Sequence, residues 1–201
     1  DARTGETRWV YDPRVYKLGI PPLPSPWNHR GVAYWENDGD ARVIWGTGDG
    51  YLTAVDAATG VLATEFGNNG RVSLEDGLPR ARDNPSRLPP PSRSPPLVVG
   101  NTIIVGSSIH DYLATKENAP GFVRAYDART GRHRWDFHNV PQSGDEFGAD
   151  TWHSEAWRYS GNTNTWGNIA VDAELGYVYL PTSTPTSDYY GGHRVGDNLF
   201  A

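Results

Sequence analysis

A short turn motif recurs three times along this chain and constrains its fold more than any other sequence feature. Residues 125–137 read AYDARTGRHRWDF, the chain begins DARTGETRWVYD, and residues 54–66 read AVDAATGVLATEF. Asp, Thr and Gly keep one spacing in all three copies, and a Trp follows in two, whereas Thr64 takes its place in the second. One copy would be an ordinary hairpin turn. Three copies indicate a radial repeat in which a Trp of each blade packs against the next.

Runs of alternating or β-branched residues surround these copies and predict hairpins. The expected turns lie at Asp49-Gly50 within 42–56, at Gly100-Asn101 within 96–108, and around 172–176. Helical periodicity is weak throughout, and 23 Gly and 16 Pro favour tight turns. We therefore expect an all-β chain with short antiparallel strands in about three blades. The motif copies begin 55 and 71 residues apart. Common propeller blades have about 40–50 residues, so these longer spacings indicate insertions between strands.

Composition narrows the classes of function. The net charge of -6 argues against a nucleic-acid partner, which would require a basic face. The absence of Cys excludes disulfides, thiolate zinc sites and a thiol nucleophile, and the six His lack zinc-type spacing. No apolar run reaches membrane-spanning length. The Pro- and Arg-rich stretch 75–96 is expected to be a long surface loop, because Pro cannot donate to a central strand.

The repeated A-x-D-x-x-T-G-x-x-x-W turn resembles the tryptophan-docking motif of the pyrroloquinoline quinone (PQQ) dependent dehydrogenases. Residues 94–131 and 171–194 resemble the glucose dehydrogenase-like branch of that family, and the resemblance covers practically the whole chain. It implies a partial eight-bladed β-propeller from the N-terminal half of such a protein, with residues 1–201 as a single domain truncated at both ends. It also implies oxidation of a sugar or alcohol hydroxyl in the periplasm, with a quinone or cytochrome as electron acceptor.

The resemblance also assigns cofactor contacts. Arg30 in NHRGVAY matches an Arg beside the quinone oxygens and a carboxylate, where a planar and permanently charged guanidinium suits the task. Ser108 in GSSIHDY matches a Ser that bonds a cofactor carboxylate, and Trp166 in NTNTWGN matches the Trp beneath the quinone ring. Arg93 replaces a Thr that contacts PQQ. Its side chain could pair with a PQQ carboxylate or point to solvent, and the sequence does not decide between the two.

A Ca²⁺ ion beside PQQ is implied as well. Asp111 matches an acidic ligand of that ion, and carboxylate oxygens suit a hard cation. Thr184 stands where alcohol-oxidising members have an Asn ligand, and a Thr hydroxyl or carbonyl is a weaker ligand. Pro24 and Ser25 replace the adjacent cysteines of many alcohol dehydrogenases, so a vicinal disulfide is excluded. The site residues, although far apart in sequence, are expected to converge on one polar pocket.

No residue of this chain is assigned as the catalytic base. The family's base, an Asp, belongs to a later blade beyond the segment 196–198, so the isolated chain is expected to be inactive. Two other interpretations remain: a non-catalytic propeller scaffold for protein–protein interaction, and a carbohydrate-binding module. A scaffold needs the docking Trp and Asp but not Arg30, Asp111 and Trp166 together, and that trio favours the dehydrogenase.

Overall fold

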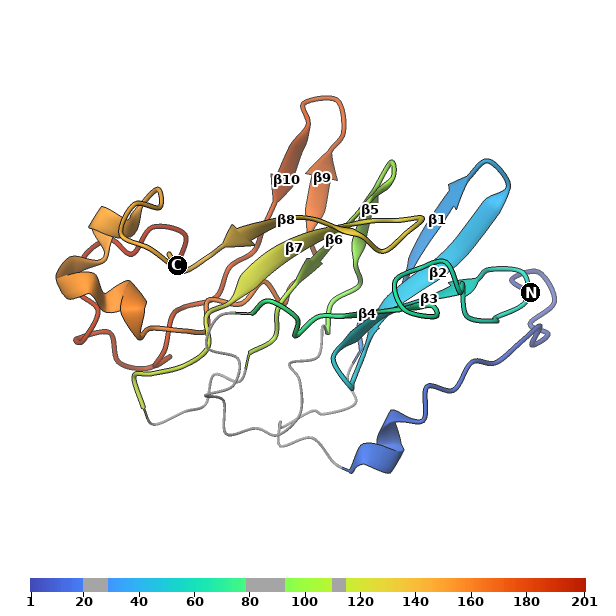
Figure 1. Cartoon of the computed structure of the whole chain (residues 1–201), viewed down its shortest axis with the longest axis horizontal. Coiled ribbons are helices and arrows are strands. Elements are labelled where there is room, and N and C mark those ends of the chain that lie inside the picture. The colour runs from blue at the N-terminus through green and yellow to red at the C-terminus, as the bar shows by residue number, and fades with distance from the viewer. Residues whose placement is uncertain (20–28, 79–92, 110–114) are drawn as a thin grey trace.

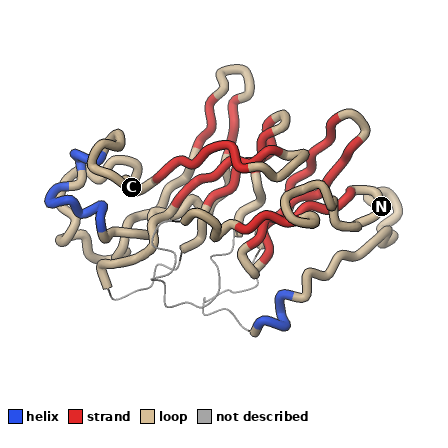
Figure 2. The backbone as a smooth tube through the Cα atoms, in the orientation of Figure 1, coloured by secondary structure: helices blue, strands red, loops and turns tan. Residues whose placement is uncertain are grey.

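The structure is a computed structural model that describes residues 1–19, 29–78, 93–109 and 115–201. Within these residues the strands form three antiparallel sheets, two with four strands and one with two (Figures 1 and 2). The first sheet contains β1(Ala33–Asn37), β2(Asp40–Thr47), β3(Tyr51–Asp56) and β4(Arg71–Ser73). The second contains β5(Leu97–Val99), β6(Thr102–Gly106), β7(Phe122–Asp127) and β8(His133–His138), and the third β9(Ala170–Asp172) and β10(Tyr177–Tyr179).

The predicted hairpins are confirmed. Thr47 pairs with Tyr51, Val99 with Thr102 and Asp172 with Tyr177 across the expected turns. A fourth hairpin, between β1 and β2, was not predicted, although an Asp-Gly dipeptide at residues 38–39 forms its turn. The described helices are short 3₁₀ segments: η1(Val15–Leu18), η3(Ala149–Thr151) and η4(His153–Arg158). None of the described helices is both long and apolar enough to cross a membrane. Most of the predicted loop 75–96 lies outside the described residues.

The middle sheet is buried on both faces. Ile103 and Val105 of β6 join a core with residues of the first sheet, among them Trp35. Ile104, which points to the opposite face, joins a second core with Val178 and other residues around the third sheet. Because both faces are covered, β6 is a nearly continuous apolar run instead of an alternating one. Successive sheets therefore stack face to face, as blades do (Figure 1).

The repeated turn has the same geometry in its second and third copies. Asp56 Oδ1 accepts hydrogen bonds from the backbone and hydroxyl of Thr59, both at 2.7 Å. Asp127 Oδ1 accepts the same pair from Thr130 at 2.8 and 2.9 Å. These side-chain bonds replace ladder bonds that a tight turn cannot form, which explains why Asp and Thr recur.

Trp9 of the first copy lies against the turn of the second copy. Its indole Nε1 donates to the carbonyl of Ala57 at 3.1 Å. A Cβ on Gly60 would lie only 2.5 Å from the Trp9 ring, so Gly is required at this position. Gly60 also has φ 73°, which other residues rarely adopt. The contact joins residues 48 positions apart.

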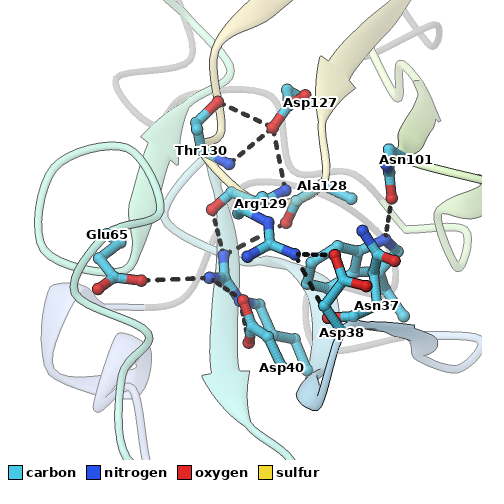
Figure 3. Close-up of polar contacts among 11 residues, drawn as sticks. Asn37, Asp38, Asp40, Glu65, Asn101, Asp127, Ala128, Arg129 and Thr130 are labelled. Atoms are coloured by element: carbon cyan, nitrogen blue, oxygen red, sulfur yellow. Dashed lines mark hydrogen bonds and ion pairs between the residues drawn. The ribbon is translucent and has the colours of Figure 1, made fainter.

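Buried arginines join the first two sheets, where Thr64 replaces the Trp of the motif. Arg42 of β2 is 1% exposed and donates to the carbonyls of Ala128, at 3.3 Å, and of Arg129 (Figure 3). Its Nη2 pairs with Asp40 at 2.7 Å. The guanidinium also lies 5.3 Å from the ring centroid of Trp35. A planar fork with several donors can serve two carbonyls and a carboxylate at once.

Arg124 makes the reciprocal connection. It lies on β7 of the second sheet, and its Nη1 donates to the carbonyls of Asp76, at 2.6 Å, and Leu74, at 3.4 Å, which follow the first sheet. Its Nε pairs with Asp136 at 3.0 Å. Each sheet thus contributes one buried arginine that binds backbone carbonyls of the other and a carboxylate on its own side. The two sheets are held by polar contacts in both directions, in addition to the apolar core between them.

Candidate functional site

Three predicted site residues precede the first strands of the three sheets. Arg30 lies three residues before β1, and Arg93 and Trp166 lie four residues before β5 and β9. We call the residues 29–32, 93–96 and 166–169 the leading segments. Hydrogen bonds connect each leading segment to the next: the Arg30 amide donates to the Arg93 carbonyl at 3.0 Å, and the Ser94 hydroxyl donates to the Trp166 carbonyl. The repeated architecture therefore brings together positions that are far apart in sequence.

Arg30 and Trp166 are in direct contact. The guanidinium carbon of Arg30 lies 4.9 Å from the centroid of the Trp166 ring, within the range of a cation–π interaction. Trp166 is nevertheless 46% exposed, although Trp residues are on average highly buried. An exposed aromatic surface beside a permanent positive charge suits a flat, anionic molecule. The structure therefore brings together two of the residues predicted from the sequence.

Ser108 lies at the same end of the second sheet. It follows β6 by two residues, and because β5 and β6 are antiparallel, the end of β6 lies beside the start of β5, which Arg93 precedes. Ser108 is 8% exposed, and its hydroxyl has no hydrogen-bond partner within the described part of the chain. A buried hydroxyl without a partner loses the hydrogen bonds that water would supply. Such an orphaned group fits a site that a polar ligand completes.

The sequence analysis missed one residue that connects these elements. Asn164 accepts hydrogen bonds at its Oδ1 from the amide of Ile109, at 2.7 Å, and from the hydroxyl of Ser107, at 3.2 Å. Its Nδ2 donates to the carbonyl of Ile109 at 2.7 Å. A Cβ at Gly106 would collide with the carbonyl of Thr165, so the two segments approach closely. The only sequence signal was the position of this Asn two residues before Trp166.

The predicted metal ligands are less well defined. Asp111 lies outside the described residues. The Thr184 hydroxyl accepts a hydrogen bond from Arg194 Nη2 at 3.2 Å, and its carbonyl accepts one from Thr163 at 3.3 Å. A cation at this hydroxyl would compete with the guanidinium for the same oxygen. Among the residues described here, no group of three or more His, Asp or Glu side chains could hold a metal ion. The assignment of both ligands stays a prediction.

Two shifted pKa values accompany this arrangement. Burial lowers the pKa of His29, and the positive charge of Arg30 lowers it further. The imidazole is therefore neutral at pH 7. Burial also lowers the pKa of Arg194, and the carboxylate of Asp188 opposes that effect. Since arginine pKa values start above 12, Arg194 remains charged at neutral pH. Beside Trp166 the permanent charge is the guanidinium of Arg30, which favours an anionic ligand there.

Comparison with known proteins identifies the family. Residues 1–201 match the family described as PQQ glucose/ethanol/alcohol dehydrogenase, β-propeller domain. The chain belongs to this family. It is 31% identical to quinoprotein glucose dehydrogenase A of Acinetobacter calcoaceticus, over 97% of this chain and 25% of that protein. It is 30% identical to quinoprotein glucose dehydrogenase of Escherichia coli K12, over 97% and 24%.

A solved structure supports the same conclusion. The chain superimposes on quinohemoprotein alcohol dehydrogenase from Comamonas testosteroni with a TM-score of 0.69 and 26% identity, covering 99% of this chain and 28% of that one. The chain thus spans about a quarter of the length of the curated relatives above. The predicted fold class is confirmed: the stacked antiparallel sheets are part of a β-propeller of the PQQ family.

Proposed function

We propose that this chain supplies part of the cofactor site of a PQQ-dependent dehydrogenase that oxidises a sugar or alcohol hydroxyl. The observation that carries the proposal is the contact between Arg30 and the exposed Trp166 ring, next to the buried and orphaned Ser108 hydroxyl. Family membership supports PQQ as the cofactor. In this proposal residues 1–201 act as a single domain, and the protein functions in the periplasm with a quinone or cytochrome as electron acceptor.

The residues present fit the chemical character of PQQ, which is a flat ortho-quinone with three carboxylates. Trp166 would hold the ring plane by stacking, and Arg30 would pair with a carboxylate or a quinone oxygen. Ser108 would donate its free hydroxyl hydrogen to a second carboxylate, which would satisfy a buried group. Arg93, which is half-buried next to the Arg30 backbone, would neutralise a further charge.

When bound, PQQ accepts the equivalent of a hydride from the substrate, and the protein supplies orientation and charge. Arg30 would place a permanent positive charge beside the quinone oxygens or a carboxylate of the cofactor. The indole of Trp166 would exclude water from one face of the ring. Asp111 and Thr184 are proposed as ligands of a Ca²⁺ ion, and Arg194 would then release the Thr184 hydroxyl.

Binding of PQQ by the full-length protein tests this proposal. Trp166→Ala is expected to weaken PQQ by about 1–3 kcal/mol, on the scale of a base stacked on an aromatic side chain, or about 5- to 150-fold in Kd. Tyr177→Ala is the matched control, because Tyr177 is also an exposed aromatic residue, at 60%, and begins β10 at the hairpin turn, away from the leading segments. Kd is measured by quenching of tryptophan fluorescence with PQQ in the presence of Ca²⁺.

The outcomes separate the competing functions. A wild-type protein that fails to bind PQQ would favour the non-catalytic scaffold. Equal loss of affinity in Trp166→Ala and Tyr177→Ala would show that Trp166 has no special place in the site. Loss confined to Trp166→Ala supports the assignment, and reduction of a dye by a sugar or alcohol with the reconstituted protein then tests the reaction itself.

A further inference from the structure

We infer that Asn164 is a positioning residue of the cofactor site, an inference that rests on the function proposed above. Its buried amide holds the segment that carries Ser108 in place against the segment that carries Trp166. Asn164 itself is 2% exposed and therefore cannot contact a ligand in the exposed space over Trp166. Its role is to fix the relative position of two groups that must act on one rigid ligand.

The amide of Asn164 is fully used in this task. Its Oδ1 and Nδ2 bind the N–H and the C=O of the same residue, Ile109, both at 2.7 Å. Oδ1 also accepts a hydrogen bond from the Ser107 hydroxyl, and the second hydrogen of Nδ2 is donated to the Oδ1 of Asn162. One planar side chain thus pairs with a backbone residue as a neighbouring β-strand would. Ser108 lies between the two residues that the amide binds, so the backbone at Ser108 is fixed on both sides.

The backbone of Asn164 extends the connection to a third segment. Its amide donates to the Ser183 hydroxyl at 2.9 Å, and its carbonyl accepts from the Ser183 amide at 2.8 Å. Ser183 directly precedes Thr184, the proposed metal ligand. In the other direction, Ile109 precedes Asp111 by two positions. The segments that carry the proposed cofactor and metal contacts therefore meet at one residue.

The chemistry of an amide is necessary for this connection. Only Asn and Gln combine an acceptor and two donors in one plane, and the shorter Asn fits the distances observed. A carboxylate at this place would direct an oxygen at the Ile109 carbonyl and at Asn162, so two attractive contacts would become repulsive. An apolar side chain would leave both backbone groups of Ile109, which is buried, without partners.

Variants of the full-length protein test the inference. Asn164→Asp replaces the NH₂ group by oxygen, and it is expected to raise the Kd for PQQ about tenfold or more, because the buried Ile109 carbonyl and the Asn162 side chain lose their donor. Asn68→Asp is the matched control: it makes the same chemical change at an exposed position in the turn before β4, outside the leading segments. The control is expected to keep the wild-type Kd within about twofold, as surface substitutions do.

A pH titration provides a readout that general destabilisation would not give. The introduced carboxyl group is buried, so its pKa is raised, and its protonated form regains one donor for the Ile109 carbonyl. The affinity of Asn164→Asp for PQQ should therefore recover as the pH falls from about 7.5 to about 5, relative to wild type at each pH. The affinity ratio of Asn68→Asp to wild type should stay constant over the same range.

The possible results are distinct. A wild-type protein that does not bind PQQ would overturn the proposed function and this inference with it. A wild-type protein that binds PQQ, together with unchanged affinity in Asn164→Asp, would overturn the positioning role alone. If Asn164→Asp does not fold, Asn164→Ala, which leaves room for water, takes its place. An unchanged Kd in that variant would equally overturn the role, and a raised Kd with a wild-type melting temperature would support it.

Discussion

Arg42 is expected to contribute more to the stability of the propeller than any exposed ion pair of the chain. Arg42→Leu preserves much of the side-chain volume but removes every polar contact. The carbonyls of Ala128 and Arg129 lose their donor, at about 1 kcal/mol each. The contact with the Trp35 ring adds about 0.5–2 kcal/mol. Asp40 also loses its ion-pair partner. Together these losses lower the free energy of unfolding by about 3–5 kcal/mol, the range for breaking a buried ion pair.

Arg134→Leu is the control that isolates burial as the cause. Arg134 pairs with Asp127 at 2.7 Å, the same distance as Arg42 to Asp40, but 35% of its side chain is exposed. Its removal should cost only about 0–1 kcal/mol, because solvent screens the pair. Urea unfolding followed by tryptophan fluorescence measures both free energies. Equal losses in the two variants would refute the argument that Arg42 joins the sheets where the motif lacks its Trp.

Other predictions follow from the repeated turn. Gly60→Ala should destabilise the protein by more than Gly5→Ala, because both glycines have positive φ but only Gly60 is pressed against the Trp9 ring. Gly5→Ala should cost about 1 kcal/mol for backbone strain alone, and thermal unfolding compares the two. Partial burial would raise the pKa of Asp127, but hydrogen bonds from Arg134 and from the turn outweigh it and lower the pKa to about 2. Since the folded pKa lies below the unfolded value, Asp127 stabilises the protein above about pH 4, and this contribution should be lost as the pH falls toward 2. Asp127→Asn should make the free energy of unfolding less dependent on pH between about pH 4 and pH 2. An unchanged pH dependence would contradict the lowered pKa of Asp127.

The sequence predicted the local structure well because turns depend on local chemistry. Asp49-Gly50 and Gly100-Asn101 carry their own conformational preferences, and the structure has hairpins at both. The substitution at Thr64 was visible in the sequence as a departure from the motif. The contacts that replace the missing Trp were not visible in the sequence, because Arg42 binds backbone carbonyls 86 and 87 residues away. Such contacts depend on how the blades stack, and no local pattern encodes them.

In the candidate site, too, some residues were predicted from the sequence and others were visible only in the structure. The resemblance to a known family identified Arg30 and Trp166, and the structure places them in contact. Asn164 escaped notice because a buried Asn in a polar run such as NTNTW has the sequence signature of a loop. Its importance comes from Ile109, 55 residues away, whose backbone it binds. Sequence reasoning proposed the groups that would contact a ligand, whereas the groups that hold them in place were visible only in the three-dimensional structure.

We propose that the exposed indole of Trp166 and the charge of Arg30 form one side of a PQQ site. A crystal structure of the full-length protein with PQQ and Ca²⁺ would test this arrangement. We expect density for a flat tricyclic molecule stacked on Trp166, with carboxylates within hydrogen-bonding distance of Arg30 and Ser108. Density for PQQ at another place, with the Trp166 ring covered by protein or left in contact with solvent, would contradict it.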